Sequence, residues 1–424
     1  MGLSITEKIL LAHTDKRAIT PGEFINARVD LSLANDITAP LAIKKFKASR
    51  AKKLFNRQKT VLVCDHFVPN KDARSAQQCK MIEDFAQQSR IENFYPLSRG
   101  GIEHVLLPDA GLVSPGSLVV GADSHTCTYG ALGAFSTGVG STDIAASWIT
   151  GRIWLRVPES IKFVYSGRLN KWVGGKDLIL HTIADIGVFG ALYKAMEFTG
   201  PVIKRLPMDD RFTMCNMAIE AGAKSGIIEP DGITQEYIRS VHSSQLTVHR
   251  KKIYKSDRDA NYCDIKKFDV SKLEPQVACP HLPSNVKPVN RLKKVNINQA
   301  VIGSCTNGRI SDLMLAAKVL KNRKTNSRVR LLIFPGTQRI YQQALKTGLI
   351  EVFIKAGATV CPPTCGPCLG GHMGVLGDGE VAIATTNRNF RGRMGALTSK
   401  VYLSNPAVAA ASAIKGRIAH PEEL

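Results

Sequence analysis

Three cysteines in two short segments could hold an iron–sulfur cluster. Cys365 and Cys368 share a tight turn built from Gly and Pro, and Cys305 lies in a Gly-Ser-Cys-Thr-Asn segment just after an apolar run. Iron–sulfur clusters usually take four cysteine thiolates, so three would leave one iron with an open coordination site. An open site favours Lewis-acid chemistry over electron transfer, by the logic that separates catalytic zinc sites from structural ones.

Spacing alone leaves other interpretations of the Cys-x-x-Cys pair open, namely a zinc half-site, a redox pair or structural thiols. A zinc site would need a second cysteine pair or a histidine pair at similar spacing, and the sequence offers none. A thioredoxin-like pair would open a helix, whereas residues 369–372 (Leu-Gly-Gly-His) are a poor helix start. The cluster is therefore the favoured reading.

Two Asp and His motifs follow apolar strands in the first third of the chain. Asp65 and His66 come directly after the apolar run at 60–64, and Asp123 and His125 follow the run at 117–121. Alpha/beta folds place their chemistry at the carboxyl ends of strands, so the two motifs predict a shared crevice. The local alternative for each is a satisfied surface pair.

A third polar motif has the spacing of a helix. Asn216 and Glu220 are four residues apart, which puts them on one helical face, where a solvated polar surface is the default interpretation. The glycine-rich segment 130–140 lacks the spacing and the lysine of a phosphate-binding loop, so we interpret it as close backbone packing.

Alternation of strands and helices predicts an α/β fold with mostly parallel sheets. We expect three α/β domains at residues 1–157, 158–283 and 284–424, with residues 257–281 irregular. The expected strands are 27–33, 60–64, 117–121, 160–169, 299–302, 329–334, 358–361 and 381–384, and the expected helices are 7–13, 72–88, 176–186, 311–321, 338–347 and 406–414.

Composition bounds the function further. The chain has 424 residues, 44% of them hydrophobic, which suits a globular protein with full cores. Its ten cysteines lack the regular spacing of a disulfide scaffold, and its N-terminus lacks a signal-peptide pattern, so we expect a cytoplasmic protein with reduced thiols. The absence of a long apolar run predicts no membrane span.

The net charge of +22 is the one feature that points to nucleic acid. Basic residues gather at 44–53, 251–255, 291–294 and 318–330, but aromatic residues, only 6% of the chain, do not interleave with them. We therefore interpret the charge as solvated surface and consider nucleic-acid binding unlikely, with a docking face for an acidic partner as a further possibility.

Three motifs together resemble those of the aconitase superfamily, in the order that the family has them. They are residues 303–307 (Gly-Ser-Cys-Thr-Asn), 365–370 (Cys-Gly-Pro-Cys-Leu-Gly) and 386–393 (Thr-Asn-Arg-Asn-Phe-Arg-Gly-Arg). The resemblance runs from Thr6 to Leu424 and is greatest to the short large-subunit branch that contains isopropylmalate dehydratases and homoaconitases. It implies three aconitase-type α/β domains around a central [4Fe–4S] cluster, one per subunit, with Cys305, Cys365 and Cys368 as ligands and one open iron.

The resemblance also implies roles for other residues. His66 matches the family's proton donor, with Asp65 beside it, while His104 and His125 match two further site histidines. Asp123 and Glu220 match carboxylates that orient them. The substrate-binding residues that it implies are Ser124, Asn216, Asn387, Arg388 and Arg393. Pro40 stands where aconitases proper carry a substrate-binding Gln, which argues against citrate as the substrate.

Family relatives that act alone add a swivelling domain, and no sequence after Leu424 encodes one here. We therefore expect a separate small subunit of about 150–200 residues that carries this domain, in a heterodimer or heterotetramer. The implied reaction is dehydration and rehydration of a small hydroxy-dicarboxylic acid, with isopropylmalate as the leading substrate and homocitrate as the alternative. An RNA-binding cluster protein and an electron-transfer protein are the alternatives from other classes.

Overall fold

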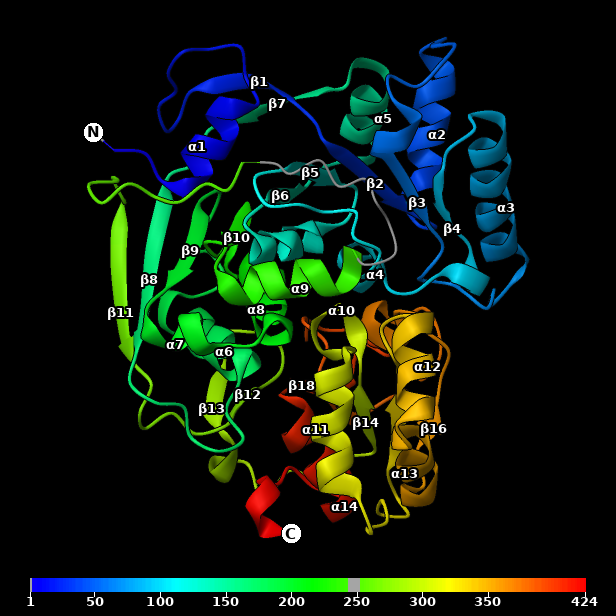
Figure 1. The fold of residues 1–424 in the computed structure, drawn as a ribbon. Helices are drawn as coiled ribbons and strands as arrows, with labels where there is room; N and C mark the ends of the chain where they lie inside the picture. The colour runs from blue at the N-terminus through cyan, green and yellow to red at the C-terminus, as the bar shows by residue number, and fades with distance from the viewer. Residues whose placement is uncertain (1, 243–251) are drawn as a thin grey trace. The chain divides into compact units, whose positions relative to one another are not determined.

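The computed structural model describes residues 2–242 and 252–424, and internal packing divides the chain into two compact units (Figure 1). Unit 1 consists of Met1–Arg99, Leu106–Ser166 and Ala191–Asp269, and unit 2 of Gly100–Val105, Gly167–Gly190 and Val270–Leu424. Two short segments from the first half of the chain thus belong to the unit formed mainly by the C-terminal part. The division into domains 1–157, 158–283 and 284–424 stays a prediction.

A parallel five-stranded sheet forms the larger layer of unit 1. Its order is β4-β3-β2-β5-β6, and every neighbouring pair is parallel, so all carboxyl ends meet at one edge. The strands are β2 (Leu31–Asn35), β3 (Thr60–Val63), β4 (Asn93–Tyr95), β5 (Leu118–Gly121) and β6 (Phe135–Gly138).

A second, four-stranded sheet of unit 1 is also parallel, in the order β10-β9-β8-β11 (Figure 1). Its strands are β8 (Ser160–Ser166), β9 (Ala195–Thr199), β10 (Ser225–Ile227) and β11 (Asp264–Asp269). An antiparallel ribbon pairs β1 (Phe24–Arg28) with β7 (Arg152–Arg156).

Two sequence-based expectations were wrong in this region. Residues 257–281 are not irregular, because they contain β11 and also β12 (Gln276–Ala278). β11 is a polar edge strand, so it lacks the apolar alternation that marks a buried strand. The strand expected at 27–33 is two strands, because at Asp30 the chain leaves the ribbon and enters the five-stranded sheet, where the backbone N–H of Asp30 donates to Leu118.

Helices cover these sheets. Those of unit 1 include α1 (Ile5–Ala12), α2 (Ala39–Ala48), α3 (Ala73–Gln88), α5 (Ser141–Thr150), α7 (Pro201–Arg205), α8 (Met208–Asn216) and α9 (Gly232–His242). The division between units at Val105 falls inside α4 (Glu103–Asp109). Short 3-10 helices at Ser124–Leu132 (η3) and Met217–Ala221 (η4) carry predicted site residues.

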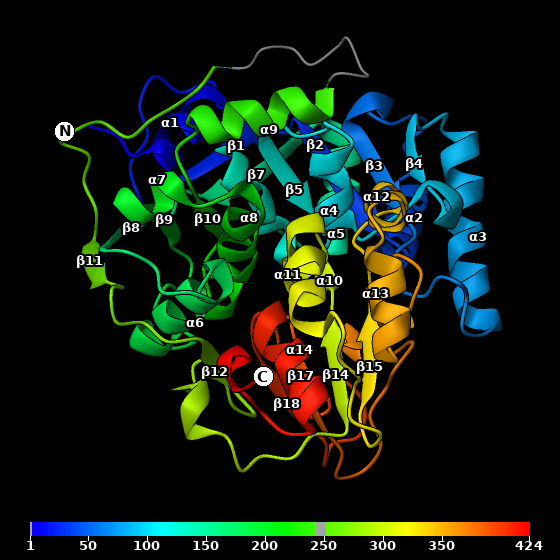
Figure 2. The same cartoon turned by 60° about the horizontal axis from the view of Figure 1, so that its bottom comes forward.

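Unit 2 is built on a seven-stranded sheet in the order β13-β12-β18-β17-β14-β15-β16 (Figure 2). The five strands from β18 to β16 are parallel, and β12 and β13 are antiparallel. Besides β12, the strands are β13 (Val286–Pro288), β14 (Gln299–Ile302), β15 (Arg330–Ile333), β16 (Thr359–Val360), β17 (Val381–Ala384) and β18 (Lys400–Leu403). Its helices include α6 (Gly175–Ile186), α10 (Ser304–Asn307), α11 (Ile310–Leu320), α12 (Gln338–Lys346), α13 (Leu349–Ala356) and α14 (Pro406–Lys415). The predicted α/β class with mostly parallel sheets is confirmed.

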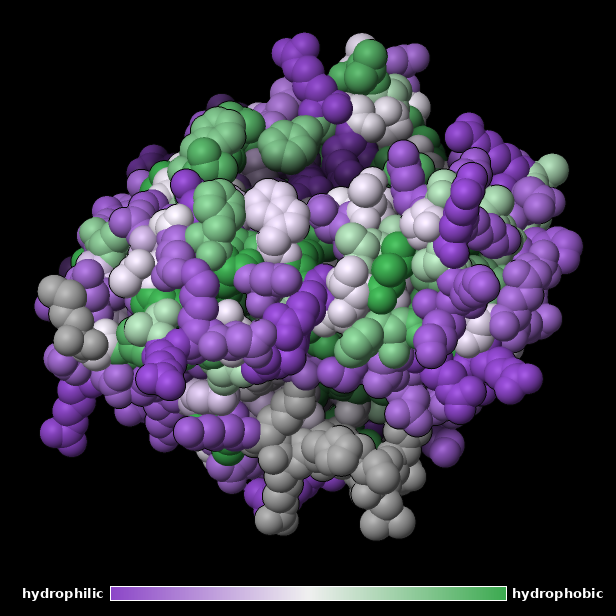
Figure 3. All heavy atoms as spheres, turned by 90° about the horizontal axis from the view of Figure 1, so that it is seen from above, coloured by the Kyte–Doolittle hydropathy of each residue, from purple (hydrophilic) through white to green (hydrophobic). Residues whose placement is uncertain are grey.

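The surface is rich in polar side chains, and Figure 3 shows one face on which hydrophilic residues surround smaller apolar patches. The basic run predicted at 251–255 begins at residue 251, which lies outside the described residues. Among the described residues, no helix has both the length and the apolar character needed to cross a membrane.

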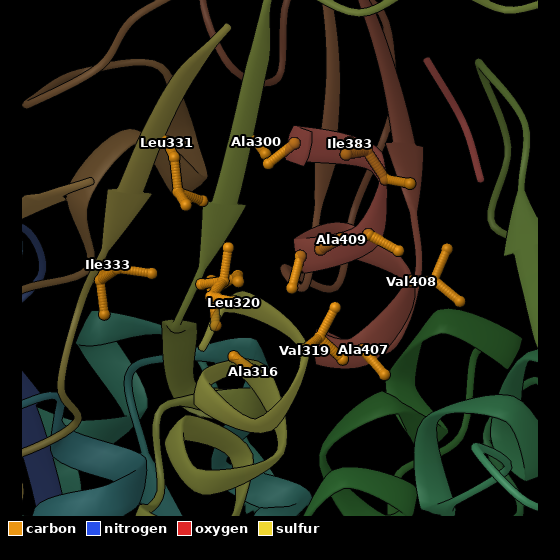
Figure 4. Packing of buried hydrophobic residues seen from close by; sticks show 14 of the residues in the cluster. Ala300, Ala316, Val319, Leu320, Leu331, Ile333, Ile383, Ala407, Val408 and Ala409 are labelled. Atoms are coloured by element: carbon orange, nitrogen blue, oxygen red, sulfur yellow. The ribbon is translucent and has the colours of Figure 1, made fainter. Parts of the chain in front are cut away.

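Each unit has its own apolar core. In unit 2, side chains from β14, β15 and β17 meet those of α11 and α14 (Figure 4). The contribution of α14 is mostly Ala and Val, whose small side chains let the helix approach the sheet closely. This packing fixes the ends of β14 and β17, from which two of the predicted site motifs emerge.

Candidate active site

The loop that carries Cys305 has a strained backbone. It follows β14, and Gly303 has a φ of +148°, while Ser304 has a φ of +74°, which is unusual for a residue with a Cβ. A Cβ on Gly303 would lie 2.6 Å from Cβ of Phe334, and a Cβ on Gly366, in the second cysteine loop, would lie 2.6 Å from the ring of Phe334. The side chain of Phe334 therefore packs against both cysteine loops, and only glycine fits at these two contacts.

One amide side chain joins the cysteine loops to the loop after β17. Nδ2 of Asn387 donates to Sγ of Cys305 at 3.3 Å, and its Oδ1 lies 3.6 Å from Sγ of Cys368. The guanidinium of Arg393 lies 3.9 Å from Sγ of Cys368, and its buried Nε has no hydrogen-bond partner among the described residues. Donors aimed at sulfur, and a guanidinium that keeps one buried N–H without a partner in the described part of the chain, indicate a site for anionic groups.

The predicted ligands are only partly shielded from solvent. Cys305 and Cys368 are buried, and Cys365 is half-buried at the start of the 3-10 helix Gly366–Leu369 (η6). Arg388 lies in the same loop as Asn387, and it is also half-buried. Cys361 differs from these thiols, because burial raises its pKa to about 11 and keeps the thiol protonated.

His66 lies between two carboxylates of unit 1. Its Nδ1 is 2.7 Å from Oδ1 of Asp65 and 3.6 Å from Oδ1 of Asp36. Asp36 follows β2, and its carboxylate also accepts the backbone N–H groups of Asp65, His66 and Phe67. Burial opposes ionisation of Asp36, but hydrogen bonds from the His66 side chain and from the backbone of Phe67 and His66 outweigh it and hold its pKa below the usual value.

Sequence reasoning missed Asp36, although the signal was present. Asn35 and Asp36 follow an apolar strand, just as Asp65 and Asp123 do, but the break between β1 and β2 hid where that strand ends. Asp36 orients the whole turn that carries the imidazole, so it belongs to the candidate site as a positioning residue.

His125, which follows β5, also lies between two carboxylates. Nε2 of His125 is 2.9 Å from Oε1 of Glu220, and Nδ1 is 3.4 Å from Oδ1 of Asp123. Asp123 caps η3 by accepting the backbone N–H of His125, and Ser124 is the first residue of that 3-10 helix. Nδ2 of Asn216 donates to Oγ1 of Thr128 in the same 3-10 helix, so η3 gathers five of the predicted residues.

The expected single helical face for Asn216 and Glu220 was wrong in detail. Asn216 is the last residue of α8, and Glu220 lies in the following 3-10 helix η4. Both side chains nevertheless reach η3, through Thr128 and His125 respectively.

His104 groups with the cysteines in unit 2. It is 2% exposed, with Nε2 3.4 Å from Oε1 of Glu103. The buried guanidinium of Arg309 donates to the backbone carbonyls of Cys305 and His104, at 3.0 and 3.1 Å. The backbone that carries His104 is thereby tied to the cysteine loop, a connection that sequence reasoning did not reveal.

Comparison with known proteins decides what this arrangement is. A model of the aconitase family (aconitate hydratase) matches residues 7–416. The chain belongs to the aconitase family. Membership implies a [4Fe–4S] cluster, and the donor set of unit 2 fits one, because the thiols lie there beside the amide of Asn387 and the guanidinium of Arg393.

Relatives within the aconitase family are similar over their whole length. A protein from Thermodesulfovibrio yellowstonii is 63% identical over 425 residues, and one from Syntrophus aciditrophicus is 60% identical over 424, each covering 100% of both chains. Both are named 3-isopropylmalate dehydratase large subunit. The solved structure of aconitase X from Thermococcus kodakaraensis, in its holo form, is 12% identical with a TM-score of 0.51, and it covers 94% of this chain and 97% of its own. That likeness concerns the fold alone.

Proposed function

We propose that this chain is the large catalytic subunit of a [4Fe–4S] hydro-lyase that interconverts 2-isopropylmalate and 3-isopropylmalate in leucine biosynthesis. The observation that carries the proposal is identity of about 60% to 3-isopropylmalate dehydratase large subunits across the whole chain. A biosynthetic enzyme of this kind would act in the cytoplasm, where its ten free cysteines stay reduced.

Cys305, Cys365 and Cys368 would hold the cluster in this proposal, leaving one iron without a protein ligand. When bound, such a cluster supplies a Lewis acid for a hydroxyl and a carboxylate oxygen. The amide of Asn387 and the guanidinium of Arg393 support thiolates at these positions, because their donors lie near the sulfurs of Cys305 and Cys368.

His66 would deliver the proton that a departing hydroxyl needs. Hydroxide is a poor leaving group, and a general acid contributes about 10²–10⁴-fold to such a step. Asp65 and Asp36 both lie near Nδ1, so that nitrogen carries a proton and Nε2 is left for exchange with substrate. Asp36 also fixes the backbone of the turn, which sets the direction of the ring.

The remaining polar residues would bind and orient the substrate. Arg388 and Arg393 carry guanidinium groups whose forked donors match a carboxylate with two parallel bonds. His125, held by Glu220 and Asp123, and His104, beside Glu103, would contact substrate or its water. Ser124 and Asn216 complete this set.

The names of the relatives support a separate partner. A protein called a large subunit implies a small one, and we propose that this partner brings the swivelling domain of the family to form a heterodimer or heterotetramer. The residues that select the side chain of the malate would then belong largely to the small subunit.

The test is an assay of the reconstituted pair. The chain, loaded with iron and sulfide without oxygen, would be mixed with the small subunit from the same genome and assayed on isopropylmalate, homocitrate and citrate. We expect turnover of isopropylmalate by the pair and little by either subunit alone. Preference for homocitrate, or full activity of this chain alone, would contradict the proposal.

A further inference from the structure

A lysine in unit 2 is buried without an obvious structural reason. Lys176 is 1% exposed and ranks among the largest fully buried side chains. It lies in the first turn of α6, where the helix dipole disfavours a cation. Removing an ammonium from water costs several kcal/mol, so nearby groups must offset its charge.

The hydrogen bonds of Lys176 orient it but do not neutralise it. Nζ donates to the backbone carbonyls of Thr385 and Thr386, at 2.7 and 2.6 Å. The neighbouring carboxylate, Asp177, is engaged elsewhere, because it accepts the backbone N–H groups of Gly174 and Gln276 and the side-chain amide of Asn405. Burial also raises the pKa of Asp177 to about 6, which weakens it as a counter-ion.

Among the groups near Lys176 that favour its charged form are two thiols of the cysteine loops. Burial lowers the pKa of Lys176 to about 7. Nearby acidic groups raise it again, Cys305 most strongly, followed by Asp312, Cys368 and Asp177. The carbonyl of Thr385 that accepts from Nζ also accepts from the hydroxyl of Thr306, the residue after Cys305. The hydroxyl of Thr385 in turn bonds the backbone of Gly303.

Lys176 therefore contacts residues 385–386. This segment is hydrogen-bonded to the Cys305 loop and leads directly into Asn387. We propose that Lys176 is a positioning residue whose buried ammonium offsets the negative charge of the cluster and its thiolates while it anchors the loop at 385–387. This inference rests on the proposed cluster. A positive charge beside the cluster favours its more reduced state, because hydrogen bonds and net charge set cluster potentials.

The experiment separates the effect of the charge at position 176 from the effect of side-chain shape. It uses the full chain, loaded with iron and sulfide under anaerobic conditions. K176Q keeps a hydrogen-bond donor and removes the charge, and K176R keeps both. K171Q is the matched control, because the side chain of Lys171 is 66% exposed and solvent screens its charge. The readouts are the midpoint potential of the [4Fe–4S] couple from an EPR-monitored titration, iron per chain and the melting temperature.

We expect K176Q to shift the midpoint to a more negative potential, and K176R and K171Q to keep that of the wild type. A wild-type midpoint in loaded K176Q would overturn the inference while the cluster stands. If K176Q loses its cluster or fails to fold, K176R decides: normal loading and an unchanged midpoint support the role of charge, and loss of the cluster or a shifted midpoint overturns it. Failure of the wild-type chain to load any cluster would instead contradict the proposed function.

Discussion

At the scale of single residues, burial separates thiols that suit metal from thiols that do not. The guanidinium of Arg393 lies 3.9 Å from the sulfur of Cys368, and a cationic donor at sulfur is the kind of neighbour that suits a thiolate ligand. Cys361 lies only seven residues earlier, and burial raises the pKa of its thiol to about 11. Two cysteines of one segment should therefore differ in chemistry.

The corresponding prediction compares C368S with C361S. Serine at 368 removes one thiolate of the proposed set, so we expect less iron per chain and hydration activity of the reconstituted pair reduced by at least about 10²-fold. C361S should keep its iron and activity, because that thiol stays protonated. Colorimetric iron determination and the isopropylmalate assay check both, and equal iron in the two variants would contradict the assignment of Cys368.

Asp36 gives a prediction about pH. Replacing it in D36N removes a charged acceptor of three backbone N–H groups, which costs about 2 kcal/mol and lowers the melting temperature by a few degrees. The folded pKa of Asp36 is depressed, so its stabilisation is complete above the unfolded pKa of about 3.9 and is lost as pH falls through the folded value.

We therefore expect the difference in melting temperature between wild type and D36N to be constant near neutral pH and to shrink below about pH 4. Differential scanning fluorimetry across a pH series measures it. D84N, which changes an exposed carboxylate on α3, is the matched control in the same unit and should show little difference at any pH. A difference that grows as pH falls would contradict the role assigned to Asp36.

At the scale of elements, the sequence predicted strands that have a regular apolar pattern. It did not predict the burial of side chains whose hydrogen-bond partners lie far away in the sequence. The strands at 299–302 and 381–384 are confirmed, and so are the Asp and His motifs at the ends of β3 and β5. Lys176 was missed because a lysine in an amphipathic pattern normally faces solvent, and only the position of Thr385 and Thr386 shows that it does not. The roles of the site residues themselves stay predictions.

The next prediction concerns an added side chain in the loop after β14. G303A would force an alanine into a backbone conformation that favours glycine and against Phe334, at 2.6 Å, so we expect a loss of about 2–4 kcal/mol and less bound iron. G348A is the matched control, because Gly348 also has a positive φ, of +75°, but has open space around it. Melting temperature and iron content distinguish them, and similar effects of both would mean that backbone strain alone, rather than the contact with Phe334, decides.

At the scale of the whole molecule, the net charge of +22 is the feature that the proposed chemistry does not use. A basic protein attracts RNA through phosphate contacts, and that attraction falls steeply with salt because bound counter-ions are released. Specific recognition of single strands would add aromatic stacking, but aromatic residues make up only 6% of this chain. The charge by itself thus predicts weak attraction without sequence preference.

We expect fluorescence anisotropy with a labelled 20-nucleotide RNA to show binding at about 50 mM salt that weakens by about 10³-fold or more at 200 mM. The affinity should be the same for unrelated sequences, and it should not change when the cluster is loaded, because the attraction comes from solvated surface charge and not from the cysteine loops. Binding that survives at 200 mM salt, prefers one sequence and disappears on cluster loading would instead favour a regulatory RNA-binding protein. The same titration with a double-stranded DNA of equal length separates general attraction to phosphate from recognition of RNA.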